Sequence, residues 1–232
     1  MNSINLKSNS VYNESEIISL IREANPAVSD VKTKWMLFDL ERNHSITRIG
    51  SRKYITYAKL YSYMPCELSE NIDSFLSENY PDVKYVIWES KQLNEWMNFL
   101  LSKNIIFVEV ESDLTEYIFS SLMEHLGQEY MILINPDNKM VSRYMRDNLV
   151  IIKSLYSRAP TDKKGHGITL EKLIVDVISD RLLTSMIGTN DRDEIIKGIV
   201  KNYTINETKA LAYAKRRQCE TEIKRALEGK YD

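Results

Sequence analysis

The chain has 232 residues, which is long enough for one large or two small domains, and its formal net charge is −2. The whole-chain charge therefore points to no partner, and 43% hydrophobic with 28% charged residues is ordinary for a soluble globular protein. The seven glycines leave little material for phosphate-cradling loops, and no apolar run approaches the ~20 residues that a membrane span needs. Cys66 and Cys219 have neither metal nor disulfide-framework spacing, so they predict reduced thiols in a cytoplasmic protein.

Two helices are predicted first along the chain. Asn13 and Glu16 have the spacing of a capping box, and the helix that they begin ends at Asn25–Pro26. A second helix begins at Ser29 or Asp30, whose side-chain oxygens can accept from free backbone N–H groups, and it ends near residue 43.

The apolar residues of the second helix predict which of its faces is buried. Val31, Trp35 and Phe38 recur at i, i+4 and i+7, which is the period of one helical face. Leu37 and Leu40 lie beside them, and we therefore expect this apolar face to pack in the core of the N-terminal region.

A hairpin is predicted directly after the second helix. Ile46, Ile49 and Tyr54 are strand formers, and Gly50–Ser51 can adopt the dihedral angles of a tight turn. A helix followed at once by a hairpin is typical of the end of a winged helix, in which a recognition helix precedes the wing. A complete winged helix usually has one more helix in front, and only residues 1–7 are available for it. We therefore predict a trimmed winged helix-turn-helix domain over residues 1–62.

Local charge supports DNA binding by this domain. Residues 31–59 have a net charge of +5, and phosphate binding needs such a local cationic surface whatever the total charge of the chain. An ordinary helix–hairpin with solvated cations is the alternative. The predicted DNA-binding residues are Lys32, Lys34 and Arg42 on the helix and Arg48, Arg52 and Lys53 on the wing.

Residues 63–232 are predicted to form an α/β domain, because strands and helices alternate along them. This alternation indicates a mainly parallel or mixed sheet covered by helices. Residues 156–167 interrupt the pattern and predict a mobile surface loop in which His166 has no role. A helical tail follows over 168–229, and its last helix runs from Asn206 to about Leu227. The predicted strands are 83–88, 105–110, 130–134 and 149–155, and the helices between them are 67–79, 93–101, 114–126 and 139–146.

Two sets of carboxylates in this domain have residue types found in metal sites. Asp82, Glu89 and Lys91 have the residue types of a PD-(D/E)xK nuclease, but the two carboxylates flank one strand and would lie roughly 23 Å apart. Glu109 and Glu111 share a strand face, as in nucleotidyltransferases, but the Gly-Ser turn that those enzymes need is absent upstream. We predict no catalytic residues, no metal and no cofactor. A metal-dependent nuclease or nucleotidyltransferase relative that uses Glu109 and Glu111 stays open as an alternative.

Charge also divides the chain into regions of opposite sign. Residues 64–136 have a net charge of −10, whereas the last helix is rich in lysine and arginine. Such a helix is usually a solvated face, but it could also bind phosphate or a partner. The candidates for this second basic surface are Lys209, Lys215, Arg216 and Arg217.

Several segments of the chain resemble the AbiEi-type antitoxins and their uncharacterised relatives. The segments are 34–40 and 46–54 in the helix and wing, and 105–111, 169–176 and 213–217 in the α/β region and tail. The resemblance implies an antitoxin of a type IV toxin–antitoxin system, with a winged helix that represses its own operon by binding operator DNA. It also implies a C-terminal part that counteracts a nucleotidyltransferase-like toxin without a stable complex. A protein-interaction module with a vestigial winged helix is a further alternative.

Overall fold

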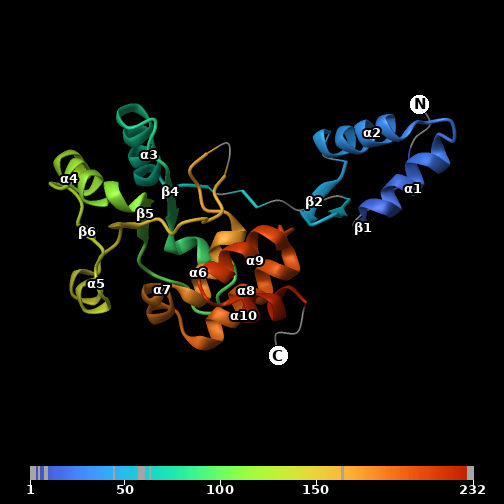
Figure 1. Cartoon of the computed structure of the whole chain (residues 1–232). Coiled ribbons are helices and arrows are strands. Elements are labelled where there is room, and N and C mark those ends of the chain that lie inside the picture. The colour runs from blue at the N-terminus through green and yellow to red at the C-terminus, as the bar shows by residue number, and fades with distance from the viewer. Residues whose placement is uncertain are drawn as a thin grey trace. The chain divides into compact units, whose positions relative to one another are not determined.

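The computed structural model describes residues 4, 6–7, 10–43, 45–56, 61–62, 64–162 and 165–228. The chain divides into two compact units, one of residues 1–61 with 202–209 and one of residues 62–201 with 210–232. Figure 1 shows the elements of both units. Residues 4, 6 and 7 are not helical, so these described residues contribute no extra helix in front of the first unit.

The first unit places two helices against a small antiparallel sheet with the order β1-β3-β2 (Figure 1). Its core contains residues of α1, α2 and the hairpin: Ile17, Ile21, Met36, Leu37, Ile46 and Tyr54. The elements are β1 (Val11–Asn13), α1 (Glu14–Ala24), α2 (Asp30–Arg42), β2 (Thr47–Gly50) and β3 (Lys53–Ile55).

Local hydrogen bonds set the boundaries of these elements. The backbone N–H of Asn13 donates to Glu16 Oε2 at 2.6 Å, which confirms the predicted capping box of α1. The Ser29 side chain accepts from the backbone of Lys32 and caps α2. Arg52 adopts a left-handed conformation, with φ 55°, in the turn between β2 and β3. The predicted hairpin is therefore confirmed.

The predicted buried face of α2 is wrong. Val31, Trp35 and Phe38 are 68%, 62% and 53% exposed. Of the apolar residues named for this face, Leu37 is buried, and the helix buries it together with Met36 and Thr33, whose hydroxyl donates to the Ser29 carbonyl at 3.0 Å. Both faces of α2 carry apolar residues, so the spacing alone could not decide which face α1 and the hairpin would cover.

A four-stranded mixed sheet forms the centre of the second unit, as predicted. The strand order is β4-β5-β7-β6, and β4 runs antiparallel to β5 while β5, β7 and β6 are parallel. Helices α3 and α4 pack on one face of this sheet (Figure 1). The elements are α3 (Glu67–Asn79), β4 (Tyr85–Glu89), β5 (Ile105–Val110), α4 (Thr115–Leu126), β6 (Ile132–Ile134), α5 (Asn138–Tyr144) and β7 (Leu149–Ser154), with short 3-10 turns η1 (Ser90–Glu95) and η2 (Ser112–Leu114).

The helix predicted over 93–101 is absent. Only η1 is helical, and an irregular segment connects it to β5. The amide side chain of Asn94 holds this segment, because it accepts from the backbone N–H of Leu101 at 2.7 Å and donates to the Leu101 carbonyl at 3.2 Å. A side chain that bonds the backbone seven residues away competes with helical hydrogen bonding.

The end of the segment 156–167, for which the sequence predicts a mobile surface loop, pairs with β4. The backbone N–H of Ile87 donates to the His166 carbonyl at 2.7 Å. The His166 ring stacks on Tyr85 with centroids 3.9 Å apart, and its Nδ1 lies 2.7 Å from Asp73 Oδ1. His166 therefore has a structural role that we did not predict. Residues 163 and 164 lie outside the described residues.

Five helices follow in the described part of the tail. The predicted last helix is in fact two helices, because Gln218 adopts φ 60° and the backbone N–H of Cys219 bonds the Ala214 carbonyl. Among the described residues, no helix combines the length and the apolar composition needed to cross a bilayer. The helices are α6 (Leu170–Ser179), α7 (Arg181–Met186), α8 (Thr189–Asn202), α9 (Glu207–Arg216) and α10 (Glu220–Leu227).

Candidate nucleic-acid interface and buried charge network

The six predicted DNA-binding residues all have exposed side chains in the first unit. Three belong to α2 and three to the hairpin β2–β3, in elements that follow each other directly in the chain. Exposure is what contact with a phosphate backbone requires, because each cation must exchange its water and counterions for a phosphate oxygen.

The hairpin cations are partly ordered by neighbouring groups. Arg48 Nε donates to the Gly50 carbonyl at 3.3 Å, and its guanidinium lies 6.0 Å from the centroid of the Tyr54 ring. Lys53 Nζ lies 3.3 Å from Glu207 Oε2. Arg52 occupies the turn itself and forms no ion pair with the described residues. Among the three hairpin cations, Arg52 at the tip is therefore the one with the fewest contacts to other described side chains.

The exposed surface of α2 combines cations with apolar side chains. Lys32 and Lys34 share this helix with Trp35 and Phe38, whose rings make an edge-to-face contact with centroids 6.1 Å apart. Arg42 pairs with Asp39 at 3.0 Å in the last turn, where a cation also interacts favourably with the helix dipole.

The predicted second basic surface is only partly present. Lys209, Lys215 and Arg216 are exposed. Arg217 is not a surface residue, because its side chain is 5% exposed and its Nη1 lies 3.3 Å from Asp176 Oδ1. The chain leaves the helical conformation after Arg216, and this break directs Arg217 inward.

Arg217 belongs to a buried charge network on the face of the sheet opposite α3 and α4. Lys172, which is fully buried in α6, lies 2.7 Å from Glu109 Oε1 and also contacts Asp176. Trp88 Nε1 donates to Glu109 at 2.8 Å, and the Tyr213 hydroxyl donates to Asp176 at 2.8 Å. The six charged members of the buried charge network are Glu109, Lys153, Lys172, Asp176, Asp180 and Arg217.

Lys153 connects the sheet to α7. It is paired in register with Glu109 on the neighbouring parallel strand, and its Nζ lies 3.6 Å from Glu109 Oε1 and 2.7 Å from Asp180 Oδ2. Burial alone would lower the pKa of Lys153, but Glu109 and Asp180 raise it above its ordinary value. The ammonium is therefore charged over the whole physiological pH range.

These contacts count against Glu109 and Glu111 as a metal-binding pair. Glu109 is buried and bound by two lysines and an indole N–H, whereas Glu111 is exposed beyond the end of β5. Glu89 is likewise occupied, because it accepts from the Cys66 backbone at 2.7 Å and from Asn104 at 2.8 Å. Among the described residues, no group of three or more metal-ligating side chains gathers.

Sequence reasoning missed the buried charge network apart from Glu109 and Arg217. A signal was available, since Lys172 and Asp176 lie four residues apart in a helix whose other residues are nearly all apolar. Such a pair can form an ion pair along the helix, and an otherwise apolar helix is usually buried all round. Lys153 similarly follows four apolar residues in β7.

The free energy of unfolding of the second unit is expected to fall as the pH drops from about 6 to about 3. Burial alone would raise the pKa of Glu109, but Lys153 and Lys172 bring it below 4.5. Burial would also raise the pKa of Asp180, but Lys153 brings it below 3.8. A lowered folded-state pKa contributes stability above the unfolded-state value, and this contribution is lost as the pH falls through the folded-state value.

Urea denaturation between pH 3 and 6, followed by tryptophan fluorescence, measures this dependence, over a window of about three pH units. The variant Asp180→Asn should show a shallower dependence because one of the two titrating groups is removed. A denaturation midpoint that stays constant over the window would contradict the ionised network.

Taken together, the fold and these sites define a mixed α/β protein that carries a helix–hairpin unit with exposed cations. Residues 32–232 match the protein family described as a family of unknown function, DUF6577, and the chain belongs to that family. The match begins inside α2 and covers the hairpin and the whole second unit. No curated protein matches the chain.

Proposed function

We propose that the first unit binds duplex DNA through α2 and the β2–β3 hairpin, and that the chain is a non-enzymatic transcriptional regulator of the antitoxin type. The observation that carries the proposal is the set of six exposed cations on two consecutive elements of one small unit. Each cation that replaces a counterion at a phosphate adds to affinity without regard to base sequence.

The order of elements supports the same proposal. A short strand, two helices and a hairpin, with the first strand paired to the last, is an arrangement that winged-helix domains use. In such a domain the second helix enters the major groove and the hairpin touches the flanking backbone. Here α2 would supply Lys32 and Lys34 to the groove, and Arg52 at the hairpin tip would meet the next phosphates.

Simultaneous replacement of Arg48, Arg52 and Lys53 by alanine is expected to weaken DNA binding. If all three contact phosphates, the slope of log K against log salt should decrease by up to roughly 3 units. Fluorescence anisotropy of a labelled duplex, titrated with the full-length chain at several salt concentrations, measures both the affinity and the slope.

A matched control removes the same charge from the other unit. Lys139, Arg143 and Arg146 are exposed on and just after α5, and their triple alanine variant should keep the wild-type affinity and slope. Equal binding by the hairpin variant and the wild type would show that the hairpin is not a wing.

The antitoxin part of the proposal rests on the resemblance of the chain to AbiEi-type antitoxins. It implies that the DNA is the operator of the protein's own operon and that the functional partner is a nucleotidyltransferase-like toxin. The acidic region over 64–136 repels a phosphate array, which supports a division of labour between the two units. The candidates for counteracting the toxin are then the exposed cations of α9, which are Lys209, Lys215 and Arg216.

A protein-interaction module is the second candidate function, and the exposed apolar residues of α2 favour it. Val31, Trp35 and Phe38 present two aromatic rings and a branched side chain outside the core of the first unit. Aromatic side chains of this kind are enriched at the centres of protein interfaces. The DNA titration separates the two functions, because an interaction module would show no salt-dependent binding to the duplex.

A further inference from the structure

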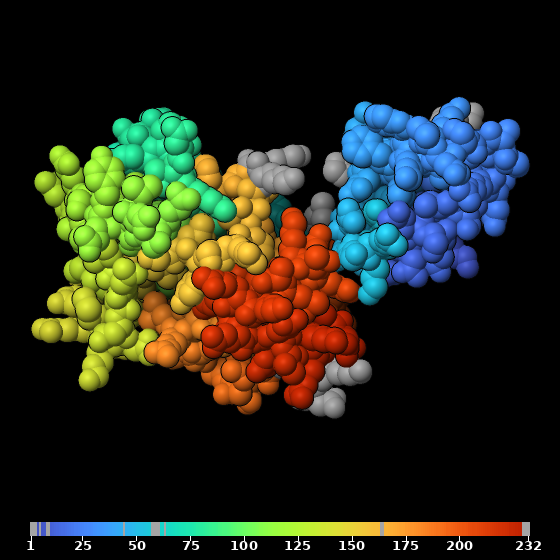
Figure 2. Space-filling view, in the orientation of Figure 1, coloured from blue at the N-terminus to red at the C-terminus, as the bar shows by residue number. Residues whose placement is uncertain are grey.

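A pocket lies at the carboxyl ends of β6 and β7, entirely within the second unit. Its volume is about 620 Å³, and residues of β7, α7 and the α9–α10 junction form its walls. Figure 2 shows the surface of the segment after β7, in yellow and orange, bordering the red surface of α9 and α10. Ligands of open α/β sheets characteristically bind outside the carboxyl ends of the parallel strands.

Cationic side chains line this pocket. Lys153 belongs to the wall contributed by β7, Arg181 begins α7, Arg216 ends α9 and Arg217 follows it. Arg217 is almost fully buried, and its contacts with Asp176 and with the Tyr213 hydroxyl both use Nη1. Its Nε and Nη2 form no further hydrogen bond with the described residues. A buried guanidinium with free donors in a pocket wall can bind an anion in two-point fashion.

The charge balance of the pocket is positive. The three cations of the buried charge network cancel its three anions. Arg181 and Arg216 are additional, and neither forms an ion pair with the described residues. Arg216 is oriented by Ser157, to which its Nε donates at 2.9 Å. Two positive charges therefore stay uncompensated at the pocket wall.

An aromatic surface stands beside these cations. The Arg217 guanidinium lies 3.7 Å from the centroid of the Tyr156 ring, and Tyr156 is 51% exposed. The guanidinium thus covers one face of the ring, while about half of the side chain stays exposed. Stacking of a base on an aromatic side chain is independent of base identity, because every base has a π face.

We propose that this pocket binds a nucleoside phosphate, with the phosphate on Arg181, Arg216 and Arg217 and the base against Tyr156. The volume fits a ligand of this size, since small-molecule pockets span roughly 300–1,000 Å³. The residues of this site differ from those of the DNA-binding surface proposed for the first unit. Either proposal can therefore be refuted without refuting the other.

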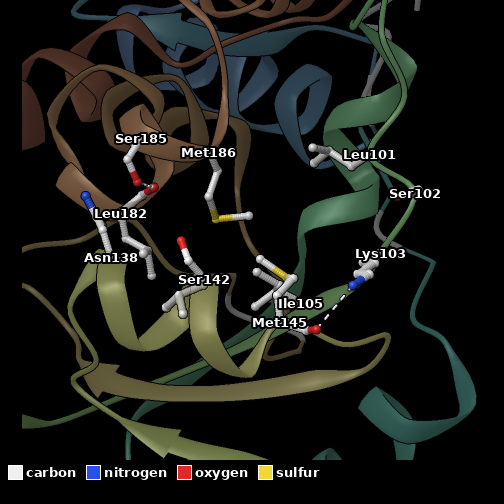
Figure 3. Close-up of a pocket in the computed structure, with 11 residues that line it drawn as sticks. Leu101, Ser102, Lys103, Ile105, Asn138, Ser142, Met145, Leu182, Ser185 and Met186 are labelled. Carbon is white, nitrogen blue, oxygen red and sulfur yellow. Dashed lines mark hydrogen bonds between the residues drawn. The ribbon is translucent and has the colours of Figure 1, made fainter.

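A second hollow in the same unit lacks this chemistry. It has a volume of about 270 Å³, and Figure 3 shows Ile105, Met145, Leu182 and Met186 directed into it. Its cation, Lys103, donates to the Met145 carbonyl at 3.2 Å (Figure 3). This hollow is lined mainly by apolar side chains, and no arginine is among its described lining residues to bind an anion.

Isothermal titration calorimetry of the full-length chain with AMP, ATP and inorganic phosphate tests the proposal. AMP or ATP should bind with a Kd below about 1 mM and more tightly than inorganic phosphate. Arg216→Ala should weaken nucleotide binding about tenfold or more, because a charge-assisted hydrogen bond is lost. Tyr156→Leu should weaken AMP binding by about fivefold or more and leave phosphate binding unchanged.

Arg225→Ala is the matched control. Arg225 is exposed on α10 and is not among the described residues that line the pocket. Its loss should change nucleotide affinity by less than about twofold. Absence of binding by all three ligands, or equal weakening by Arg225→Ala and Arg216→Ala, would overturn the proposal. Binding of phosphate as tight as that of AMP, with no effect of Tyr156→Leu, would overturn the assignment of a nucleoside.

Discussion

Replacement of Lys172 by methionine is expected to destabilise the second unit by about 3–5 kcal/mol, the typical cost of removing one partner from a buried ion pair. Lys172 is fully buried and contacts two carboxylates, Glu109 and Asp176. Methionine fills a similar volume but leaves both carboxylates without this cation. Because a domain is stable by only about 5–15 kcal/mol, the loss is a large share of the total.

Urea denaturation followed by tryptophan fluorescence measures this effect. Trp88 is buried, stacks on Phe107 and donates to Glu109, so it reports on the network directly. A Trp35→Phe background removes the exposed indole of the first unit, which keeps the signal specific when the two units unfold separately.

Two further variants make the result interpretable. Lys197 is exposed on α8, and Lys197→Met should change stability by less than about 0.5 kcal/mol. Adding Glu109→Gln to Lys172→Met should recover part of the loss, because Lys153 then keeps Asp180, Arg217 keeps Asp176, and the network again has as many cations as anions. A loss below about 1 kcal/mol in the single variant would mean that Glu109 and Asp176 do not depend on this lysine.

Local sequence patterns predicted the helices and strands better than they predicted which elements pack against each other. The helix over 67–79 and the strand over 105–110 are present with the predicted bounds. Both have a clear period of apolar residues, and such a period depends only on adjacent positions in the chain. The helix predicted over 93–101 does not form, because the Asn94 side chain makes hydrogen bonds with the backbone of Leu101. The spacing of apolar residues does not reveal such a contact.

The candidate sites were harder to predict for a different reason. A charged residue in a sequence is normally assigned to the surface, and Lys172 and Arg217 are buried only because carboxylates from β5 and α6 face them. Those partners are 63 and 41 residues away in the chain. The exposed cations of the hairpin were predictable, because a turn between two short strands is solvated whatever packs beneath it.

Under the proposed antitoxin function, replacement of Lys209 and Lys215 by glutamate is expected to abolish protection of cells against the proposed nucleotidyltransferase-like toxin and to leave repression nearly unchanged. Both side chains are exposed on α9, and the cations proposed for DNA binding lie on other elements. Reversing a charge in an interaction surface places like charges together, which costs several kcal/mol. Arg217 is unsuitable for this test, because a glutamate beside Asp176 would disrupt the buried charge network and unfold the unit.

Growth of cells that express the toxin, together with a reporter fused to the operator, measures the two activities in the same full-length variant. Lys197→Glu with Lys201→Glu is the matched control, because it reverses two exposed charges on α8. This control should retain both protection and repression. If the α9 variant loses repression instead, α9 contacts the flanking phosphates and belongs to the DNA-binding surface. If it keeps both activities, the second role lies elsewhere in the second unit, and the positively charged pocket beside Arg216 becomes the next surface to test.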